Sequence, residues 1–364
     1  MLNLFFLKAI ITNQLTKLKL SMKSKFIKTT QCILATIVIA CTSPTLESDA
    51  AMPESNTKTS VSTQKMAGYN LVVDINGTGD YKTIQQAFTA VTANNTAETK
   101  IFIKNGRYKE KLVLPKDKIN VTIVGESKDG VIITYNDYAS KLNSVGTAIG
   151  TSGSASFVIT GSNFKASSVT FENSSGNVGQ AVAVRVDGDK AIFNNCNFLG
   201  FQDTLYTRTD TSRQYYYKCY IAGATDFIFG ASTAVFDQCQ IFAKKGGTYI
   251  TAASTNQTSK FGYVFLNCNL RTDSGKATYY LGRPWGNYAK TVFLNCDMAN
   301  HIKPEGWHNW SKPEAESTTF YGEYKSTGLG GNMSSRVKWS HPLSDAQAKE
   351  YTVSKIFNGW VPVL

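Results

Sequence analysis

The 364-residue sequence lacks several patterns that mark common classes of enzyme and binding protein. It has only three histidines, all beyond residue 300, and none of its seven cysteines forms a C-x-x-C pair, so the usual spacing of a zinc site is missing. No G-x-S-x-G segment is present, which argues against Ser-His-Asp hydrolysis on a strand-to-helix elbow. Dense clusters of Lys and Arg, typical of nucleic-acid binding, are also missing. We therefore expect no metal, no cofactor and no nucleic-acid partner.

Positive charge is unevenly distributed along the chain. The formal net charge is +12; residues 1–41 carry six lysines and no acid, and residues 42–67 carry three acids and two lysines, so +7 belongs to residues 68–364. The chain is 42% hydrophobic and 12% aromatic, which is enough for a sizeable core. A mildly basic body suits an anionic partner, and it is equally typical of a soluble protein that is basic for no functional reason.

The first 41 residues have the pattern of an export signal. From Met22 the sequence reads MKSKFIKTTQCILATIVIAC, and its apolar stretch Ile33–Ala40 is too short to span a bilayer. We expect translation to start at Met22. The ending VIAC resembles the lipobox of bacterial lipoproteins, which implies lipidation of Cys41 and anchoring to the outer membrane of the cell envelope. The alternative is cleavage near SDA (48–50), which discards Cys41 and gives a secreted protein. Residues 42–67 have the composition of a flexible tether, and 68–364 form the folded body.

Five of the cysteines mark a repeat in the body. Each follows an apolar or aromatic pair and two mostly polar residues, and an apolar residue comes two positions later. The phrases are IFNNCNF, YYYKCYI, VFDQCQI, VFLNCNL and VFLNCDM, with Cys196, Cys219, Cys239, Cys268 and Cys296. Their intervals of 23, 20, 29 and 28 residues are typical of a solenoid. The units are short β-branched and aromatic runs broken by Gly, Asn, Asp and Ser, which indicates strands.

A right-handed parallel β-helix fits this repeat better than the alternatives. A leucine-rich repeat needs Leu-x-x-Leu-x-Leu and helical segments, and a β-propeller needs about 40–50 residues per blade. The one convincing amphipathic helix is YKTIQQAFTAV (81–91), and we expect it to cap the first coil because the ends of a solenoid must be covered. The predicted fold class is therefore all-β, a right-handed parallel β-helix with a short N-terminal capping helix.

The cysteine ladder is expected to be part of the core, since a free cysteine packs as a small apolar residue. Export nevertheless permits a disulfide. Adjacent rungs of a β-helix lie about 4.8 Å apart, within disulfide reach. Cys219 and Cys239 are the candidate pair.

Two acids occupy the same position in consecutive repeats. Asp203 lies seven residues after Cys196, and Asp226 lies seven residues after Cys219. If each cysteine marks the same inward position, the two acids stack on one face with backbones about 5 Å apart. Two carboxylates this close do not both ionise readily, so one stays protonated beside an anion, which supplies a general acid next to a nucleophile. The alternative is that both are turn residues that cap the backbone.

From about residue 70 to 360 the sequence resembles the pectin methylesterases, which are carbohydrate esterases on a right-handed parallel β-helix. The matching phrases, in the family's order, are GTGDYKTIQQA (77–87), GRYKE (106–110), GQAVAVRV (179–186), FQDTLY (201–206), CYIAGATDFIFG (219–230), YLGRPWG (280–286), IKPEGWHNW (302–310) and EYKSTGLG (323–330). We interpret GRYKE and GWHNW as structural rather than catalytic.

The resemblance implies roles for five polar residues. Asp226 would be the nucleophile that attacks the C6 methyl-ester carbonyl of a galacturonate unit. Asp203 would protonate the departing methanol and then activate water. Gln180, about one coil before Asp203, and Gln202 would donate hydrogen bonds to the oxyanion. Arg283 would pair with Asp226, keep it ionised and orient it.

The resemblance also implies how the substrate binds. Tyr206, Phe229 and Trp285 would offer flat apolar faces to sugar rings, with Gln180 and Arg283 also in contact with the substrate. Thr151 matches a substrate contact by counting back along the chain. The family pairs the cysteines that flank DFIFG, which agrees with Cys219–Cys239. GAS (230–232) departs from plant members, which usually have Gly-Asn there, and we expect this to affect a subsite rather than the chemistry.

We therefore predict a metal-independent pectinesterase that acts as a monomer on methyl-esterified polygalacturonate (pectin) through an aspartyl acyl-enzyme. A galacturonase or a lyase on the same scaffold fits less well, because the former needs several close acids and the latter typically uses Ca²⁺ with a basic residue. The remaining alternative is an envelope lipoprotein of the same fold with drifted ester specificity or a binding role.

Overall fold

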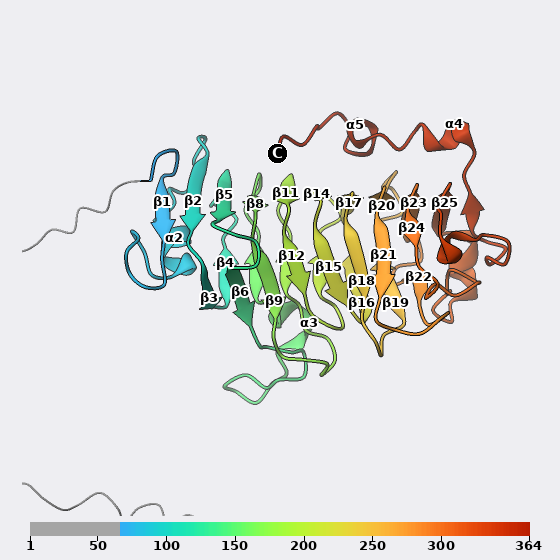
Figure 1. Cartoon of the computed structure of the whole chain (residues 1–364), viewed down its shortest axis with the longest axis horizontal. Coiled ribbons are helices and arrows are strands. Elements are labelled where there is room, and N and C mark those ends of the chain that lie inside the picture. The colour runs from blue at the N-terminus through green and yellow to red at the C-terminus, as the bar shows by residue number, and fades with distance from the viewer. Residues whose placement is uncertain (1–65) are drawn as a thin grey trace, which may run out of the picture. The chain divides into compact units, whose positions relative to one another are not determined.

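The computed structural model describes residues 66–364, which wind into a β-helix of three parallel sheets (Figure 1). Successive strands along the chain belong to different sheets, so each regular coil contributes one strand to each sheet. The pairings between the named strands are parallel, which confirms the predicted right-handed parallel β-helix. The expected export signal, the lipidated Cys41 and the tether up to residue 65 lie outside the described residues.

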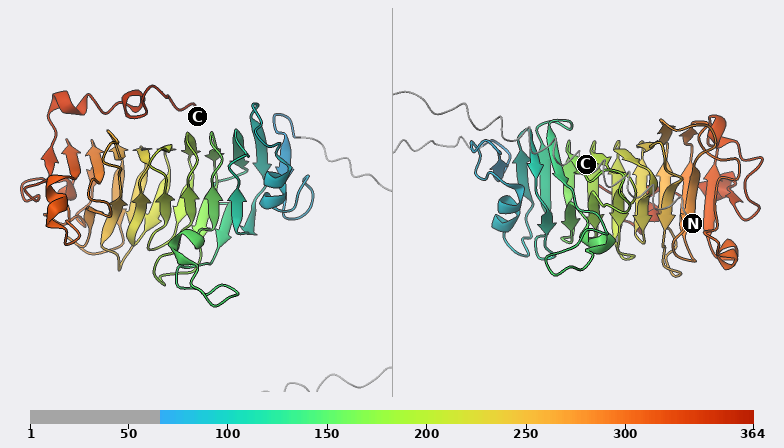
Figure 2. Two further views of the ribbon diagram at one scale, coloured as in Figure 1. Left: turned by 180° about the vertical axis from the view of Figure 1, so that it is seen from behind. Right: turned by 90° about the horizontal axis from the view of Figure 1, so that it is seen from below.

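The three sheets run the length of the solenoid (Figure 2). The eleven-stranded sheet contains β1 (Leu71–Val73), β2 (Thr99–Ile103), β5 (Val121–Gly125), β8 (Lys165–Ser167), β11 (Ala191–Asn194), β14 (Arg213–Tyr217), β17 (Thr233–Asp237), β20 (Tyr263–Leu266), β23 (Lys290–Leu294), β25 (Phe320–Tyr324) and β26 (His341–Pro342). The eight-stranded sheet contains β3 (Gly106–Lys109), β6 (Val131–Tyr135), β9 (Thr170–Asn173), β12 (Asn197–Leu199), β15 (Tyr220–Gly223), β18 (Gln240–Ala243), β21 (Asn269–Thr272) and β24 (Asp297–Met298). The seven-stranded sheet contains β4 (Leu112–Leu114), β7 (Phe157–Ile159), β10 (Val184–Val186), β13 (Leu205–Thr207), β16 (Thr225–Gly230), β19 (Tyr249–Ala253) and β22 (Tyr280–Pro284). The helices are α2 (Ile84–Ala90), α3 (Gly150–Gly153), α4 (Asp345–Ala348), α5 (Val353–Ile356), η1 (Pro313–Ser317) and η2 (Leu329–Gly331).

Helix α2 covers the first coil, as predicted. It begins at Ile84 rather than near residue 81, because Thr83 is its N-cap and forms a capping box with Gln86. The apolar face buries Ile84, Ala87 and Phe88, and the Phe88 ring stacks on Phe157 of the coil below with centroids 5.5 Å apart. The helix therefore closes the N-terminal end of the apolar interior.

The cysteine repeat marks a turn and a stack of aromatic rings. The residue before each cysteine has a left-handed backbone, with φ between 51° and 53°, at Asn195, Lys218, Gln238, Asn267 and Asn295. Asn tolerates this conformation better than most residues, which explains why three of the five positions are Asn. The aromatic residue three positions before each cysteine stacks on the next, with centroids 4.9, 4.8, 4.5 and 4.3 Å apart, in the order Phe193, Tyr216, Phe236, Phe265 and Phe293. Each copy of the repeat therefore forms the same corner of its coil.

The predicted disulfide between Cys219 and Cys239 is wrong for this structure. All five body cysteines are buried free thiols. The strands that follow them pair in register, Tyr220 opposite Gln240, so the two cysteines do lie on adjacent rungs, as predicted. The Sγ atoms instead approach backbone carbonyls, Cys219 that of Phe193 at 3.4 Å and Cys239 that of Tyr216 at 3.3 Å.

The C-terminal segment returns along the outside of the eleven-stranded sheet (Figure 1). After β26 it runs through α4 and α5 and packs an apolar layer on that sheet's outer face. Its side chains Leu343, Ile356 and Phe357 are buried against residues such as Val235 and Val264. This segment therefore covers a sheet face that does not carry the pocket described below.

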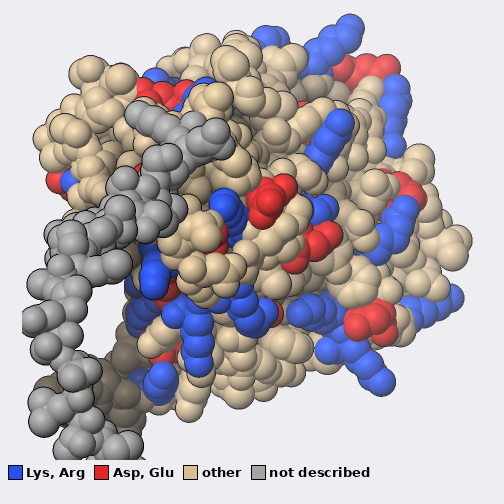
Figure 3. Space-filling model, turned by 60° about the vertical axis from the view of Figure 1, so that its left-hand side comes forward, with Lys and Arg blue, Asp and Glu red and all other residues tan. Residues whose placement is uncertain are grey.

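The surface charges are mixed. On the face in Figure 3, Lys and Arg side chains lie among Asp and Glu side chains. Exposed pairs such as Lys100–Glu98 and Lys355–Glu350 contribute little to the stability of the fold, because solvent screens their charges. None of the helices between residues 66 and 364 is long and apolar enough to cross a bilayer.

His301 is a buried histidine without hydrogen bonds. It is 0% exposed, and neither ring nitrogen has a partner among the described residues. Burial, with a smaller contribution from the charge of Arg271, lowers its pKa to about 4. Because the folded-state pKa is below the unfolded value of about 6.5, the unfolded chain binds the proton more readily, and stability is lost as pH falls from about 6.5 to 4.

We predict that His301→Leu removes this acid sensitivity. Relative to the variant, the wild-type protein should lose roughly 2–3 kcal/mol of unfolding free energy between pH 6.5 and 4. Urea unfolding of both proteins at several pH values in this range measures the difference. A constant difference between the two curves would contradict the assignment.

Candidate active site

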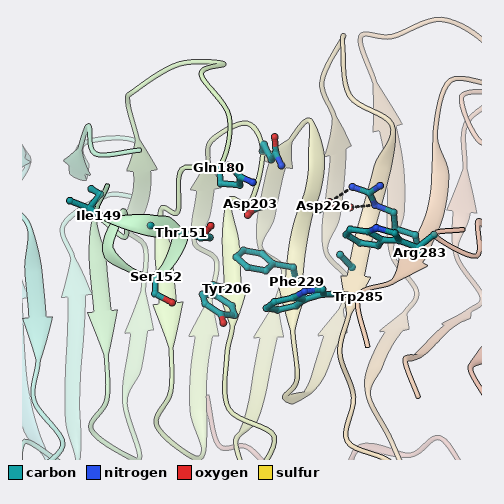
Figure 4. A pocket seen from close by; sticks show the side chains of 14 residues that line it. Ile149, Thr151, Ser152, Gln180, Asp203, Tyr206, Asp226, Phe229, Arg283 and Trp285 are labelled. Atoms are coloured by element: carbon teal, nitrogen blue, oxygen red, sulfur yellow. Dashed lines mark hydrogen bonds and ion pairs between the residues drawn. The ribbon is translucent and has the colours of Figure 1, made fainter. Parts of the chain in front are cut away.

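A pocket of about 540 Å³ lies on the outer side of the seven-stranded sheet (Figure 4). Its floor is a ladder of residues from consecutive coils: Tyr206 pairs with Phe229, Phe229 with Ala252, and Ala252 with Arg283. Helix α3 lies at one end of the pocket and Arg283 at the other (Figure 4). The lining residues are Ile149, Gly150, Thr151, Ser152, Gln180, Gln202, Asp203, Tyr206, Asp226, Phe229, Ala252, Arg283, Trp285 and Trp310.

Asp203 and Asp226 occupy equivalent positions of consecutive coils, as their spacing predicts. Leu205 pairs with Ile228, so each acid lies two residues before a paired position. The Asp203 backbone N–H donates to the Thr225 carbonyl at 3.1 Å, which joins the two turns directly. Both acids have a left-handed backbone, with φ of 64° and 51°. Asp203 is 7% exposed and Asp226 5%, and both side chains line the same pocket.

A β-bulge sets the position of Asp226. Between Thr225 and Ile228, β16 has one residue more than the facing part of β19. Such an extra residue bends a strand and re-aims its side chains, and bulges are common beside functional sites. Asp226 lies within this irregular stretch, whereas Phe227 and Ile228 are fully buried in the core.

Arg283 holds Asp226 with a bidentate ion pair. Its Nε and Nη2 atoms donate to the two carboxylate oxygens at 2.9 and 2.5 Å. The small side chain of Ala252, which lies between Phe229 and Arg283 in the ladder, leaves room for the guanidinium to reach back toward β16. Within residues 66–364, Arg283 makes no hydrogen bond or ion pair with Asp203, so the cation distinguishes the two acids.

Aromatic rings fix the guanidinium from both sides. The Arg283 Cζ atom lies 3.9 Å from the ring centroid of Tyr249 and 3.6 Å from that of Trp310. Trp310 belongs to GWHNW, a segment predicted above to be structural rather than catalytic. That interpretation holds for the buried Trp307 but is wrong for Trp310, which lines the pocket. The sequence did not indicate that Trp310 lies in the pocket, because its position depends on the turn that follows it. In that turn Lys312 Nζ donates to the carbonyls of Pro284 and Trp285, at 3.2 and 2.8 Å.

The environments of the two acids differ in charge. Burial, together with the negative charge of Asp226, raises the pKa of Asp203 to about 8, although Arg283 opposes the rise. Burial also raises the pKa of Asp226, and the hydrogen bonds and charge of Arg283 work against it. At neutral pH the pair therefore favours a proton on Asp203 beside an ionised Asp226.

The two glutamines line the pocket with free amides. Within residues 66–364, neither the Gln180 nor the Gln202 side chain has a hydrogen-bond partner. Their backbones are tied into the coil, since the Ala181 N–H donates to the Gln202 carbonyl at 3.1 Å. Their amide donors are therefore available to a ligand that enters the pocket.

The predicted sugar-contact residues are also in the pocket. The rings of Tyr206 and Phe229 stack with centroids 4.2 Å apart, and Trp285 is tilted beside them and 42% exposed. Thr151 lies in α3 and lines the wall. Its neighbours Ile149 and Ser152 were missed, because their segment carries no pattern that indicates a ligand contact.

Three comparisons with known proteins agree. The pectinesterase family model matches residues 70–360. Among curated proteins, pectinesterase QRT1 of Arabidopsis thaliana is 40% identical over 290 residues, covering 77% of this chain and 75% of that protein. Pectinesterase 31 of the same plant is 41% identical over 288 residues, covering 77% and 89%.

Solved structures of the same kind superimpose on the chain. The pectin methylesterase from carrot matches with a TM-score of 0.73 and 34% identity, covering 81% of this chain and 94% of that one. The pectin methylesterase PemA from Erwinia chrysanthemi matches with a TM-score of 0.71 and 33% identity, covering 82% and 100%. A pectin methylesterase in complex with a hexasaccharide is equally similar, with a TM-score of 0.71.

We predict that Arg283→Gln raises the pKa of Asp226 further, because the neutral side chain leaves the effect of burial unopposed. Carbon-13 NMR titration of the aspartate carboxyl groups measures this, with the Asp226 signal identified by its loss in Asp226→Ala. Arg213→Gln is the matched control, since Arg213 makes the same bidentate pair with Asp189 away from the pocket. An unchanged Asp226 titration in Arg283→Gln would contradict the role of the cation.

Proposed function

The chain belongs to the pectinesterase family, and from that premise we propose that its pocket hydrolyses the methyl esters of pectin with Asp226 as the nucleophile. The family is one of carboxylic ester hydrolases that act on pectin. One observation supports the assignment above all: two buried acids share a position on consecutive coils, and Arg283 pairs with only one of them. That arrangement supplies an anion for attack and a proton for the leaving group.

The first half-reaction forms an acyl-enzyme. An Asp226 carboxylate oxygen adds to the C6 carbonyl carbon of an esterified galacturonate unit. The amides of Gln180 and Gln202 donate hydrogen bonds to the resulting oxyanion, where charge develops. When the intermediate collapses, the bond between C6 and the methoxy oxygen breaks, and Asp203 gives its proton to that oxygen. Methanol leaves, and C6 is joined to Asp226 as a mixed anhydride.

The second half-reaction consumes one water molecule. Asp203, now a carboxylate, removes a proton from water while the oxygen adds to C6. Collapse of this second intermediate breaks the anhydride and returns Asp226 as a carboxylate paired with Arg283. The product is a free galacturonate carboxylic acid, which loses its proton to solvent, and Asp203 is again protonated.

The stacked rings of Tyr206 and Phe229 and the exposed Trp285 give sugar rings an apolar surface near the two acids. Thr151 completes the wall at the α3 end. We propose that these residues orient the polymer so that one ester carbonyl faces Asp226.

We also propose that residues 1–41 direct export and that Cys41 carries a lipid, with residues 42–67 as a tether to a monomeric catalytic body. The support is the lysine-rich start, the apolar stretch and the VIAC ending of the sequence. Pectin is an extracellular polymer, so an exported enzyme suits its substrate.

We predict that the purified body releases methanol from highly methylated pectin in the presence of a chelator, and that Asp226→Ala abolishes the release. Methanol, uronate reducing ends and unsaturated products are measured in the same reaction. Asp189→Ala, which breaks an equivalent ion pair on the eleven-stranded sheet, should retain activity.

The other products of this assay would reject the proposal in favour of a specific alternative. New reducing ends would indicate a galacturonase, and unsaturated ends a lyase. No product at all would favour a binding protein or an esterase with another acyl substrate.

We further predict that kcat/KM for methanol release falls as pH rises through about 8. The free enzyme needs a proton on Asp203, and the pKa of Asp203 is about 8. A pH profile from 5 to 10 with a soluble methylated oligogalacturonate tests this. A kcat/KM value that stays constant up to pH 10 would show that Asp203 is not the proton donor.

A further inference from the structure

One histidine behind the pocket contacts both aromatic residues that hold the Arg283 guanidinium, Tyr249 and Trp310. The ring centroid of His308 lies 5.6 Å from that of Tyr249, and its Nδ1 atom accepts a hydrogen bond from the Trp310 backbone N–H at 3.0 Å. His308 is half-buried, does not line the pocket and has no part in the mechanism above. A single side chain therefore connects the two faces of the guanidinium.

His308 is also attached to the strand that carries the guanidinium. Its backbone N–H donates to the carbonyl of Gly282, the residue before Arg283, at 3.1 Å. Its ring lies against Tyr280 of the same strand, β22, with centroids 5.3 Å apart. Tyr280 stacks in turn on Tyr249 of β19, with centroids 5.4 Å apart. The imidazole is thus held in place by the two strands that present Tyr249 and Arg283.

Trp310 needs the hydrogen bond from its backbone because its conformation is unfavourable. Trp310 and Ser311 have left-handed backbones, with φ of 57° and 55°. Bulky side chains disfavour this region, and such residues keep it only where their surroundings hold them there. His308 provides the one acceptor that the Trp310 N–H has among the described residues, and Asn309 Oδ1 accepts from the Ser311 N–H at 2.9 Å. Loss of the His308 acceptor therefore frees the indole to leave the guanidinium.

Only the neutral form of His308 can accept this hydrogen bond. A neutral ring that accepts at Nδ1 carries its hydrogen on Nε2, whereas both nitrogens of the imidazolium are donors. The groups around the ring are the phenols of Tyr249 and Tyr280 and the cations of Arg283 and Lys303. Burial, and then the charges of Arg283 and Lys303, lower the pKa of His308 from 6.5. The ring is therefore neutral at pH 7 and becomes a cation only in acid.

We propose that His308 is a positioning residue, whose neutral ring holds Trp310 on the Arg283 guanidinium and so keeps the guanidinium aligned with both carboxylate oxygens of Asp226 (Figure 4). The proposal rests on the function proposed above. A proton on His308 removes the acceptor for the Trp310 N–H and places a new cation beside Arg283 and Lys303. Trp310 then leaves the guanidinium, and the nucleophile loses its fixed partner. Acid therefore weakens the enzyme at His308 as well as at Asp226 itself.

Two variants separate the acceptor of His308 from its ring. His308→Asn keeps an acceptor near the place of Nδ1, as Asn309 does toward Ser311, but it does not titrate. His308→Phe keeps a ring against Tyr249 but has no acceptor. With highly methylated pectin at pH 7, we expect His308→Asn to retain most of the wild-type kcat/KM for methanol release. His308→Phe should lose about 10-fold, as is typical when a hydrogen-bond donor is left unpaired.

The decisive measurement is the ratio of kcat/KM in the wild-type protein to that in His308→Asn, at pH values from 7.5 down to 4.5. Both proteins contain Asp226 and His301, so the titration of these residues affects both. We expect the ratio to be constant above pH 6.5 and to fall about 10-fold below it, because only the wild-type protein loses its acceptor. His341→Asn is the matched control, since His341 stacks on Phe320 with centroids 4.5 Å apart on the eleven-stranded sheet. Its ratio to the wild-type protein should not change with pH.

A second measurement does not depend on activity. In nitrogen-15 NMR spectra, the Trp310 backbone amide signal should shift with pH at the midpoint of the His308 ring titration, and it should not shift in this way in His308→Asn. The signal is assigned by its loss from a sample in which Trp310 is replaced by Phe. An amide signal that ignores the His308 titration would reject the contact.

The results distinguish failure of the positioning role from failure of the function. If the wild-type protein releases no methanol at any pH, the proposed function is rejected, and the amide signal still tests the contact. If methanol is released but the ratio of the wild-type protein to His308→Asn is the same at every pH, only the positioning role is rejected. Equal activity of His308→Phe and His308→Asn at pH 7 would reject it as well, and urea unfolding at that pH verifies that both variants are folded.

Discussion

The bidentate pair between Arg283 and Asp226 is the interaction on which the site depends. The coil-to-coil register makes Asp203 and Asp226 equivalent in position, and both are almost fully buried. Burial alone would raise both pKa values and leave two neutral acids, which offer a proton but no anion. Because Arg283 pairs with Asp226 only, it separates the two by charge and gives each a different role.

The β-helix makes this pair possible by combining regular and irregular features. Regular stacking brings β16 and β22 within two rungs of each other across Ala252, a residue small enough to let the guanidinium pass. The irregular features are the bulge at Asp226 and the turn that places Trp310 on the guanidinium.

The sequence predicted those parts of the structure that follow from the repeat interval. The seven-residue spacing after Cys196 and Cys219 placed the two acids correctly, because in-register parallel strands convert equal spacing into the same location on successive coils. The same reasoning failed for Cys219 and Cys239. Proximity along the ladder is necessary for a disulfide but not sufficient, and here both thiols are free. The roles of Arg283 and the two glutamines were predicted only from the resemblance to the family, because their spacing in the sequence does not indicate those roles.

By itself, the sequence determined the parallel β-helix, its N-terminal cap, the buried cysteine ladder and the stacking of Asp203 and Asp226, because each depends on local pattern and period. Only the tertiary structure decided the positions of Trp310 and Tyr249 on either side of Arg283 and the bulge at Asp226. These features join residues from coils of different length. Loop lengths and bulges change how far apart such residues lie, and they leave no periodic pattern in the sequence. The physical reason is that register repeats along the chain, whereas the contacts of a turn or a bulge depend on the particular neighbours that fold against it.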